Sequence, residues 1–211
     1  MFQKYFFIGN YLLIILVGIL YWYKLKQSLP LKLFMWFLVY SLITEIVGTY
    51  FAFYAKINTA LIYNTWNLIS YLFYSYLFLV IIKNKTKRKV IFYLTLTYLI
   101  YELVNTLFYQ NYLTDVYAYS TILIKIFLVI TILMYFLELL KSDLILNVKE
   151  SMFFWISLGV LIYSIGFIPV FVIAKLIDYQ GIFRHITFAL NISVSLCFIT
   201  GFIVSKKEYN V

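Results

Sequence analysis

Charged residues are scarce in this sequence of 211 residues, where they make up 12% of the chain. Soluble domains carry about 25% charged residues. Hydrophobic residues make up 65% of the chain, and its mean hydropathy is +0.96. These values indicate an integral membrane protein in which apolar helices use most of the length and leave no soluble domain over.

Cysteine, histidine and the common catalytic motifs are also rare or missing, and each shortage excludes a class of site. The single cysteine, Cys197, excludes an intrachain disulfide, and the single histidine, His185, excludes multi-histidine zinc or di-iron sites. No G-x-S-x-G, H-E-x-x-H or phosphate-binding glycine loop occurs in the sequence. Nothing therefore points to an enzyme, a metal or another cofactor, although a metal-independent lipid-modifying activity stays open.

Seven continuous apolar runs of 19 to 24 residues are present, each long enough for one membrane-spanning helix. They cover residues 5–23, 33–53, 61–82, 90–109, 117–140, 152–174 and 185–204. Strands of an outer-membrane barrel would instead alternate over about 10 residues. We therefore predict an all-α, polytopic membrane bundle of seven transmembrane helices that forms one domain over residues 1–211. The run 90–109 is the weakest of the seven, because it holds Glu102, Asn105 and Thr106.

The net charge of +9 comes from basic residues in the short loops between the runs, which excludes a nucleic-acid-binding surface. Four basic residues lie on one side of the predicted membrane, and Lys125 lies inside a run. Twelve lie on the other side, namely Lys24, Lys26, Lys32, Lys83, Lys85, Lys87, Arg88, Lys89, Lys141, Lys149, Lys206 and Lys207. The positive-inside rule then predicts an N-terminus outside and a C-terminus in the cytoplasm, as an odd number of spans requires. We expect a multi-pass protein of a bacterial inner membrane, with membrane lipids around it and basic loops open to a cytoplasmic protein partner.

Several polar residues fall at a similar depth in the outer half of the predicted membrane. Glu45 stands near the middle of its run, where a carboxylate is costly unless it faces protein or water. Counting inward at ~1.5 Å per residue places the whole group roughly 5–13 Å below the outer surface. Its members are Asn10, Glu45, Asn64, Asn67, Glu102, Asn105, Lys125 and Asn191, with His185 at the boundary. We expect these side chains to converge on a polar cavity that binds a ligand or an ion.

Lys125 is the natural partner for either Glu45 or Glu102 at this depth. One lysine balances only one carboxylate, so the other acid would be free to carry a proton, bind a cation or hold an amine ligand. Two alternatives stay open. The polar groups form an internal network that only fixes helix register, or Lys125 extends outward to the interface. Glu138 and Lys141, three residues apart, are interpreted as an interfacial ion pair.

The run 152–174 combines small residues with a proline. Gly159, Tyr163 and Gly166 share one helix face, which favours close approach of a neighbouring helix. Pro169 removes a backbone hydrogen bond, so the segment SIGFIP (residues 164–169) is predicted to kink or partly open the helix.

Three segments resemble a family of small seven-span membrane proteins of Bacteroidota. They are YNTWNLISYLFYSYLF (63–78), FWISLGVLIYSIG (154–166) and ITFALNISVSL (186–196). The shared positions are Asn64, Trp155, Gly159, Tyr163, Gly166 and Asn191. The chain departs from the pattern at Ser70, Ser157 and Thr187, where the family has glutamate, asparagine and histidine. The resemblance implies the fold and the lineage, and it implies no activity.

Three hypotheses for function follow. The first is a sensory or ligand-binding module with an outer cavity that signals to a cytoplasmic partner. The second is a small proton-coupled transporter that uses Glu45, Glu102 and Lys125. The third is a homo-oligomeric effector that forms a pore or perturbs the bilayer under the control of a cytoplasmic partner.

Overall fold

The computed structural model describes residues 2–177 and 181–210, and these residues form helices and connecting loops without any strand. Seven helices have 19 to 26 residues, and each overlaps one apolar run. The elements are α1 (Phe2–Leu20), α2 (Trp22–Leu25), α3 (Leu29–Tyr50), the π-helix η1 (Phe51–Ala55), α4 (Ala60–Ile81), α5 (Lys85–Phe108), α6 (Ala118–Leu139), the 3-10 helix η2 (Asp143–Glu150), α7 (Met152–Ile177), α8 (Gly181–Val204) and the 3-10 helix η3 (Lys207–Tyr209). The prediction of an all-α fold is confirmed for this part of the chain.

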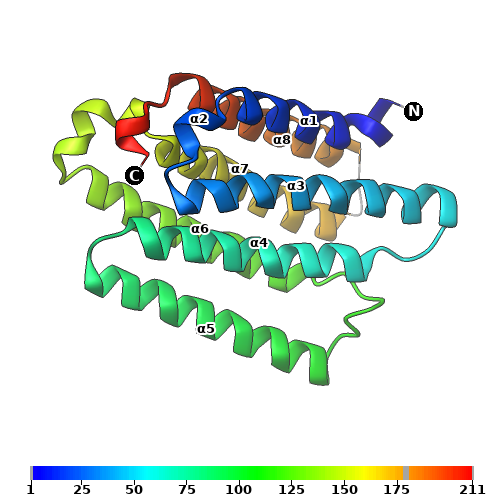
Figure 1. Ribbon diagram of the computed structural model, residues 1–211. Helices are drawn as coiled ribbons and strands as arrows, with labels where there is room; N and C mark the ends of the chain where they lie inside the picture. Colours follow the sequence, from blue (N-terminus) through cyan, green and yellow to red (C-terminus); the bar gives the residue numbers. More distant parts are fainter. Residues whose placement is uncertain (1, 178–180, 211) are drawn as a thin grey trace.

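Six of the long helices form a closed ring. Neighbouring helices contact one another in the order α1, α3, α4, α6, α7 and α8, and α8 also contacts α1. Figure 1 shows the ring as two layers, with α1, α3 and α4 in front of α8, α7 and α6. The seventh helix, α5, lies outside the ring against α4 and α6. This arrangement gives the ring an interior of its own and leaves α5 peripheral.

Five of these helices are long and apolar enough to cross a membrane. They are Leu29–Ala55, Lys85–Phe108, Ala118–Leu139, Met152–Ile173 and His185–Val204. The described apolar part of α1, Tyr5–Leu20, is shorter, and α4 is not among the five although it has 22 residues. Large hydrophobic side chains such as Leu16, Ile43 and Leu103 are exposed on the outside of the bundle, as in a protein surrounded by lipid. The run 90–109 is the weakest candidate for a span in the sequence, yet α5, which contains it, is apolar enough to cross a membrane and α4 is not.

Three helices begin at the same end of the bundle, each with a residue that suits a helix start. Asn84 caps α5, where its side chain accepts a hydrogen bond from the backbone N–H of Lys87. Pro30 stands in the first turn of α3, where a proline needs no donor, so α3 begins four residues before the predicted run. At the start of α7, the buried side chain of Asn210 accepts a hydrogen bond of 2.8 Å from the N–H of Met152. This hydrogen bond links two residues that are far apart in the sequence, Met152 and Asn210.

Glu138 does not make the predicted pair with Lys141. Its carboxylate accepts hydrogen bonds from the backbone N–H groups of Lys83 and Asn84 and lies 3.5 Å from the Nζ of Lys87. The N-terminal end of α5 attracts the carboxylate because its first N–H groups carry partial positive charge. The spacing of residues along α6 gave no sign of this contact, which comes from the loop between α4 and α5.

Helices α7 and α8 approach each other closely through glycine. A Cβ at Gly166 would lie 2.5 Å from the Cδ2 of Leu190, and one at Gly159 would lie 3.1 Å from the Cβ of Cys197. Gly201 does the same from the side of α8, against Trp155. Pro169 lies inside α7, which continues as one helix to Ile177, so the helix does not end at the proline, and the predicted kink or partial opening stays a prediction.

Candidate functional site

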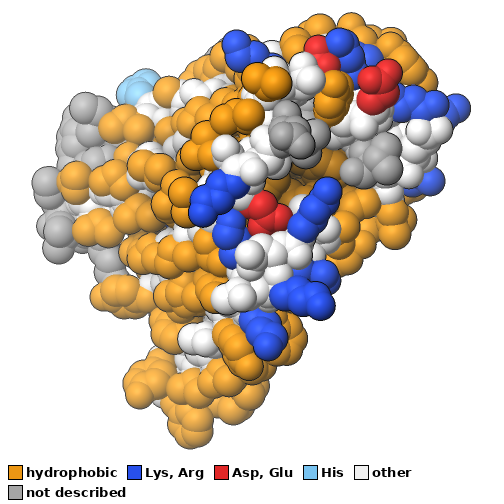
Figure 2. Space-filling model, turned by 90° about the vertical axis from the view of Figure 1, so that its left-hand side faces the viewer, with side chains coloured by type: hydrophobic (Ala, Val, Ile, Leu, Met, Phe, Trp, Pro, Cys, Tyr) orange, Lys and Arg blue, Asp and Glu red, His pale blue; other side chains and the backbone are white. Residues whose placement is uncertain are grey.

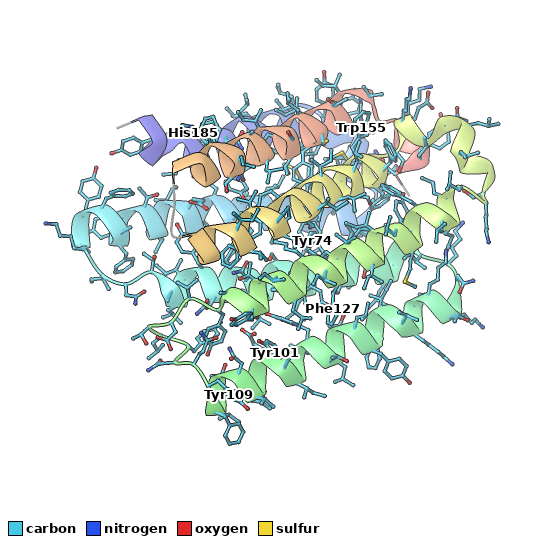
Figure 3. The ribbon with its side chains drawn as sticks, turned by 180° about the vertical axis from the view of Figure 1, so that it is seen from behind. Tyr74, Tyr101, Tyr109, Phe127, Trp155 and His185 are labelled. Atoms are coloured by element: carbon cyan, nitrogen blue, oxygen red, sulfur yellow. The ribbon has the colours of Figure 1, made fainter. Side chains whose placement is uncertain are left out.

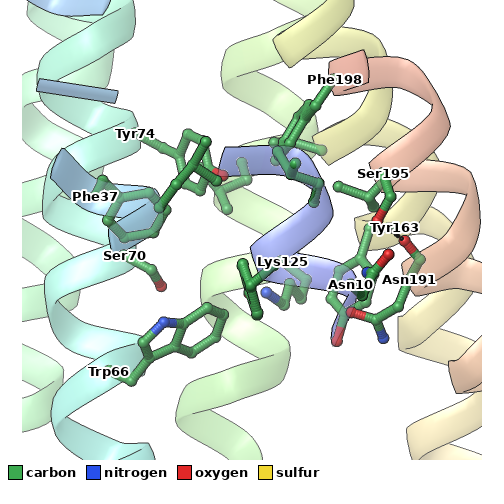
Figure 4. A pocket seen from close by; sticks show the side chains of 16 residues that line it. Asn10, Phe37, Trp66, Ser70, Tyr74, Lys125, Tyr163, Asn191, Ser195 and Phe198 are labelled. Atoms are coloured by element: carbon green, nitrogen blue, oxygen red, sulfur yellow. Dashed lines mark hydrogen bonds between the residues drawn. The ribbon is translucent and has the colours of Figure 1, made fainter. Parts of the chain in front are cut away.

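A cavity of about 80 Å³ lies inside the ring, and all six ring helices contribute to its wall (Figure 4). Its polar lining residues are Asn10 and Tyr11 of α1, Ser70 and Tyr74 of α4, Lys125 of α6, Tyr163 of α7, and Asn191 and Ser195 of α8. The rest of the wall is apolar or aromatic, including Phe37, Trp66 and Phe198. A cavity of about 150 Å³ holds benzene, so this one has room for a smaller group. It is the candidate site.

Among the described residues, Lys125 is the only charged one that lines this cavity, and its side chain is 6% exposed. Its Nζ lies 5.0 Å from the centre of the Tyr163 ring and 5.9 Å from that of Phe167. Over residues 2–177 and 181–210, the ion pairs found are Lys87–Glu138 and Lys206–Glu150, so neither expected acid is within ion-pair distance of Lys125. Aromatic rings therefore take the place that a carboxylate was predicted to fill.

Hydrogen bonds hold several polar groups of the wall in place. The amide nitrogen of Asn191 on α8 donates to the carbonyl of Thr187 at 2.8 Å. On the opposite wall, the indole N–H of Trp66 donates to the Ser41 hydroxyl at 3.0 Å. The wall thus holds several neutral polar groups in place near one lysine, and the rest of it is apolar or aromatic.

Glu45 lies near this cavity but does not line it. The hydroxyl of Tyr63 on α4 lies beside its carboxylate. The Tyr63 ring lies over Gly48, where a Cβ would stand 2.6 Å from the hydroxyl oxygen. Glycine at this position therefore lets tyrosine reach the carboxylate one turn away. The partner of Glu45 is a neutral hydroxyl, and no cation is found for it within the described structure.

Glu102 belongs to a different place in the fold. It is buried between α5 and α6, where the Ser120 hydroxyl donates to its carboxylate. The hydroxyl of Tyr98 lies 3.2 Å from that of Ser120. Because α5 packs outside the ring, this cluster is separated from the cavity by the ring helices. The structure therefore does not bring Glu102 together with Lys125.

Three of the asparagines named above hold segments together. The side chain of Asn64 bonds to the backbone at Tyr112, Asp115 and Tyr117, and thereby holds the loop between α5 and α6. Asn105 donates to Gln110 at 3.1 Å, near the end of α5.

A direct helix–helix contact is made by Asn67, whose amide donates to the hydroxyl of Thr121 on α6 at 3.2 Å. His185 is exposed at the edge of the bundle, and Figure 3 shows it away from Tyr74, which lies inside. Of the predicted site residues, the cavity therefore contains only Asn10, Lys125 and Asn191.

The aromatic members of the site were the hardest to find from sequence. Tyr11, Trp66 and Tyr163 line the cavity, but the chain has 22 tyrosines and 21 phenylalanines, so an aromatic residue at a helical spacing carries little information. Tyr74 lies close in the sequence to two other tyrosines, Tyr71 and Tyr76. In the structure Tyr71 is buried against Tyr98 of α5, and Tyr76 is exposed.

Comparisons with known proteins found no matching family model, no matching curated protein and no matching solved structure. The resemblance to the seven-span proteins of Bacteroidota therefore stays a prediction that depends on its short motifs.

Proposed function

We propose that this protein is a membrane-embedded binding module whose ligand is a small anion held by Lys125. The observation that carries the proposal is a buried lysine that faces a cavity of mixed polar and apolar lining without a carboxylate partner among the described residues. An uncompensated buried charge is strongly unfavourable, whereas a bound anion would compensate it. Such a residue is therefore expected at a functional site rather than in a purely structural core.

The wall of the cavity suits an anion of a few heavy atoms. Asn10, Asn191 and the tyrosines carry N–H or O–H donors, which can bind anionic oxygen atoms. The volume of about 80 Å³ favours a group of the size of a short carboxylate or a phosphate. Aromatic side chains around Lys125 exclude bulk water, which strengthens the attraction between a cation and an anion.

The proposal includes the predicted topology of seven spans with the N-terminus outside. Under it α4 crosses the membrane as one helix of the ring, where contacts to other helices compensate for its polar residues. The cavity then lies in the outer half of an inner membrane, and the basic loops face the cytoplasm. The module would report an anion arriving from outside to a partner inside, which is the sensory role.

The other two hypotheses have less support. A transporter that uses Glu45, Glu102 and Lys125 needs these groups along one route, and Glu102 lies outside the ring. An oligomeric pore needs polar stripes on an outer face of the bundle, whereas Lys125 and Asn191 face the interior of one chain.

The experiment is a thermal unfolding series on the full chain in nanodiscs, with propionate, inorganic phosphate and the neutral isostere propionamide as probes. Sodium chloride keeps the ionic strength equal in all samples. At least one anion is expected to raise the Tm by several degrees, because a ligand that binds only the folded state stabilises it by about 2.7 kcal/mol at 100 times its Kd. Propionamide is expected to have no effect.

Two lysine variants complete the design. Lys125→Met is expected to abolish the shift, and Lys26→Met, which removes an exposed lysine, is expected to retain it. A shift that survives in Lys125→Met, or the absence of a shift with both anions, would refute the proposed function.

A further inference from the structure

A second hollow opens at the end of the bundle that carries the basic loops. It has a volume of about 370 Å³, within the range of about 300–1,000 Å³ that is typical of ligand pockets. Most of its wall is apolar, and Lys83 is the one charged lining residue in the part of the chain that the structure describes. The wall includes Leu29 and Pro30 of α3, Val80 of α4, Leu139 of α6 and Val148 beside α7. The hollow is separate from the Lys125 cavity, with which it shares no lining residue.

The surroundings of the hollow carry a large excess of positive charge. This end holds the twelve basic residues counted above and four acids, Glu138, Asp143, Glu150 and Glu208, so its net charge is 12 − 4 = +8. Two of the acids are already engaged, Glu138 by Lys87 and Glu150 by Lys206. Figure 2, which views this end, shows blue side chains gathered around a recess with apolar side chains in it. The positive-inside rule accounts for the lysines but not for an apolar hollow between them.

Exposed apolar residues at the mouth make the hollow accessible. The side chain of Leu29 is 59% exposed and that of Val80 is 48% exposed, and Lys83 is exposed beside them. The floor is closed by buried Tyr135 and Phe153. An apolar anchor surrounded by a charged rim is the usual anatomy of a protein–protein binding site, where the anchor supplies affinity and the rim speeds association.

We propose that this hollow is the docking site for an acidic segment of a cytoplasmic protein that inserts one apolar side chain. Charge complementarity selects the acidic partner, and the apolar floor selects the anchor. A second copy of this chain is disfavoured as the occupant, because two ends of net charge +8 repel. The inference goes beyond anion binding at Lys125 and requires only that the basic end face the cytoplasm.

The same helices connect the two sites. Helix α6 contributes Lys125 to the inner cavity and Leu139 to the hollow, and α7 contributes Tyr163 and Phe153 respectively. A small shift of α6 or α7 on anion binding would therefore reach the wall of the docking site. Docking itself does not depend on this coupling.

The test measures binding of a fluorescent peptide to the full chain in phosphatidylcholine nanodiscs. The probe is a short run of glutamates with one central phenylalanine, and the comparison peptide has serine in place of the phenylalanine. We expect the serine peptide to bind about tenfold more weakly, because the anchor supplies much of the binding energy. Leu29→Ser and Lys83→Gln are each expected to weaken binding of the phenylalanine peptide at least about fivefold.

Matched controls at the same end separate docking from general attraction. Leu146→Ser and Lys89→Gln change exposed residues that do not line the hollow, and less than about twofold change is expected for either. Equal binding of the two peptides, or equal effects of Lys83→Gln and Lys89→Gln, would overturn the proposal. It would also be overturned if no peptide binds and native mass spectrometry shows phosphatidylglycerol retained by the wild type but lost in Leu29→Ser, because the occupant would then be an anionic lipid.

Discussion

The ammonium group of Lys125 on α6 lies 5.0 Å from the centre of the Tyr163 ring on α7. A cation over an aromatic ring gains about 0.5–2 kcal/mol, which is less than burial of an unpaired charge costs. The ring therefore supports the lysine without satisfying it. Because the charge is not fully compensated, Lys125 can bind an anion, and it destabilises the unliganded protein.

The first prediction is that Lys125→Met stabilises the unliganded protein. Methionine has a similar length and no charge, so the free energy of unfolding is expected to rise by about 1–4 kcal/mol. The measurement is reversible unfolding of the full chain in mixed micelles at neutral pH. A residue that served only to hold the helices together would show a loss of stability instead.

The matched control for this prediction is Lys24→Met, for which the opposite sign is expected. The Nζ of Lys24 donates to the carbonyls of Phe202 and Ile203 at 3.2 and 2.7 Å, at the C-terminal end of α8. Loss of these bonds is expected to lower the free energy of unfolding by about 1–2 kcal/mol. If both variants shift stability in the same direction, Lys125 is not the unsatisfied group inferred above.

The helices were predictable because each is encoded locally. In lipid, a continuous apolar run of about 20 residues can form all of its backbone hydrogen bonds within itself only as a helix, independently of the segments around it. The convergence of some polar residues was also predictable, since Asn10, Lys125 and Asn191 lie on helices that belong to the ring. The same depth was assigned to Asn64 and Glu102, which do not line the cavity, so depth alone does not select the residues of its wall.

Which helix is peripheral could not be predicted from sequence. Glu102 has the depth and the polarity of a cavity residue, but α5 lies outside the ring, so its carboxylate pairs with Ser120 instead of Lys125. Contacts between distant segments were equally inaccessible, as in the bond from Met152 to Asn210. These features depend on the order of helices around the ring, which no single run encodes.

The second prediction concerns the contact between α7 and α8. A Cβ at Gly201 would lie 2.7 Å from the Cβ of Trp155, which is fixed to the helix backbone, so Gly201→Ala should destabilise the protein by about 1–3 kcal/mol. At Gly9 nothing lies within 4 Å, and Gly9→Ala should be neutral or stabilise by up to about 1 kcal/mol. Unfolding of the two variants measures both values. Equal effects would mean that α7 and α8 do not approach as described.

The third prediction is a pH dependence at the end of α8. The carboxylate of Glu150, 2.6 Å from the Nζ of Lys206, raises the pKa of this lysine above its ordinary value of 10.5. A raised folded-state pKa means that the stabilisation is fully present below 10.5 and is lost as the pH rises through the higher folded value. The difference in unfolding midpoint between wild type and Lys206→Met should therefore stay constant from neutral pH to about pH 9.5 and vanish at more alkaline pH. It should be small and should decrease with salt, because the pair is exposed, and Lys207→Met serves as the control.

The last prediction tests whether α4 crosses the membrane and fixes the orientation. Cys197 is the only cysteine, so Cys197→Ser provides a background for single-cysteine labelling in intact cells. Ile57→Cys and Lys85→Cys place exposed thiols on either side of α4, which is long but is not among the five helices that are apolar enough to cross a membrane. A membrane-impermeant maleimide is expected to label Ile57→Cys in intact cells and Lys85→Cys only after lysis. Labelling of both in intact cells, or of neither, would show that α4 does not cross the membrane, and the reverse pattern would place the basic end outside.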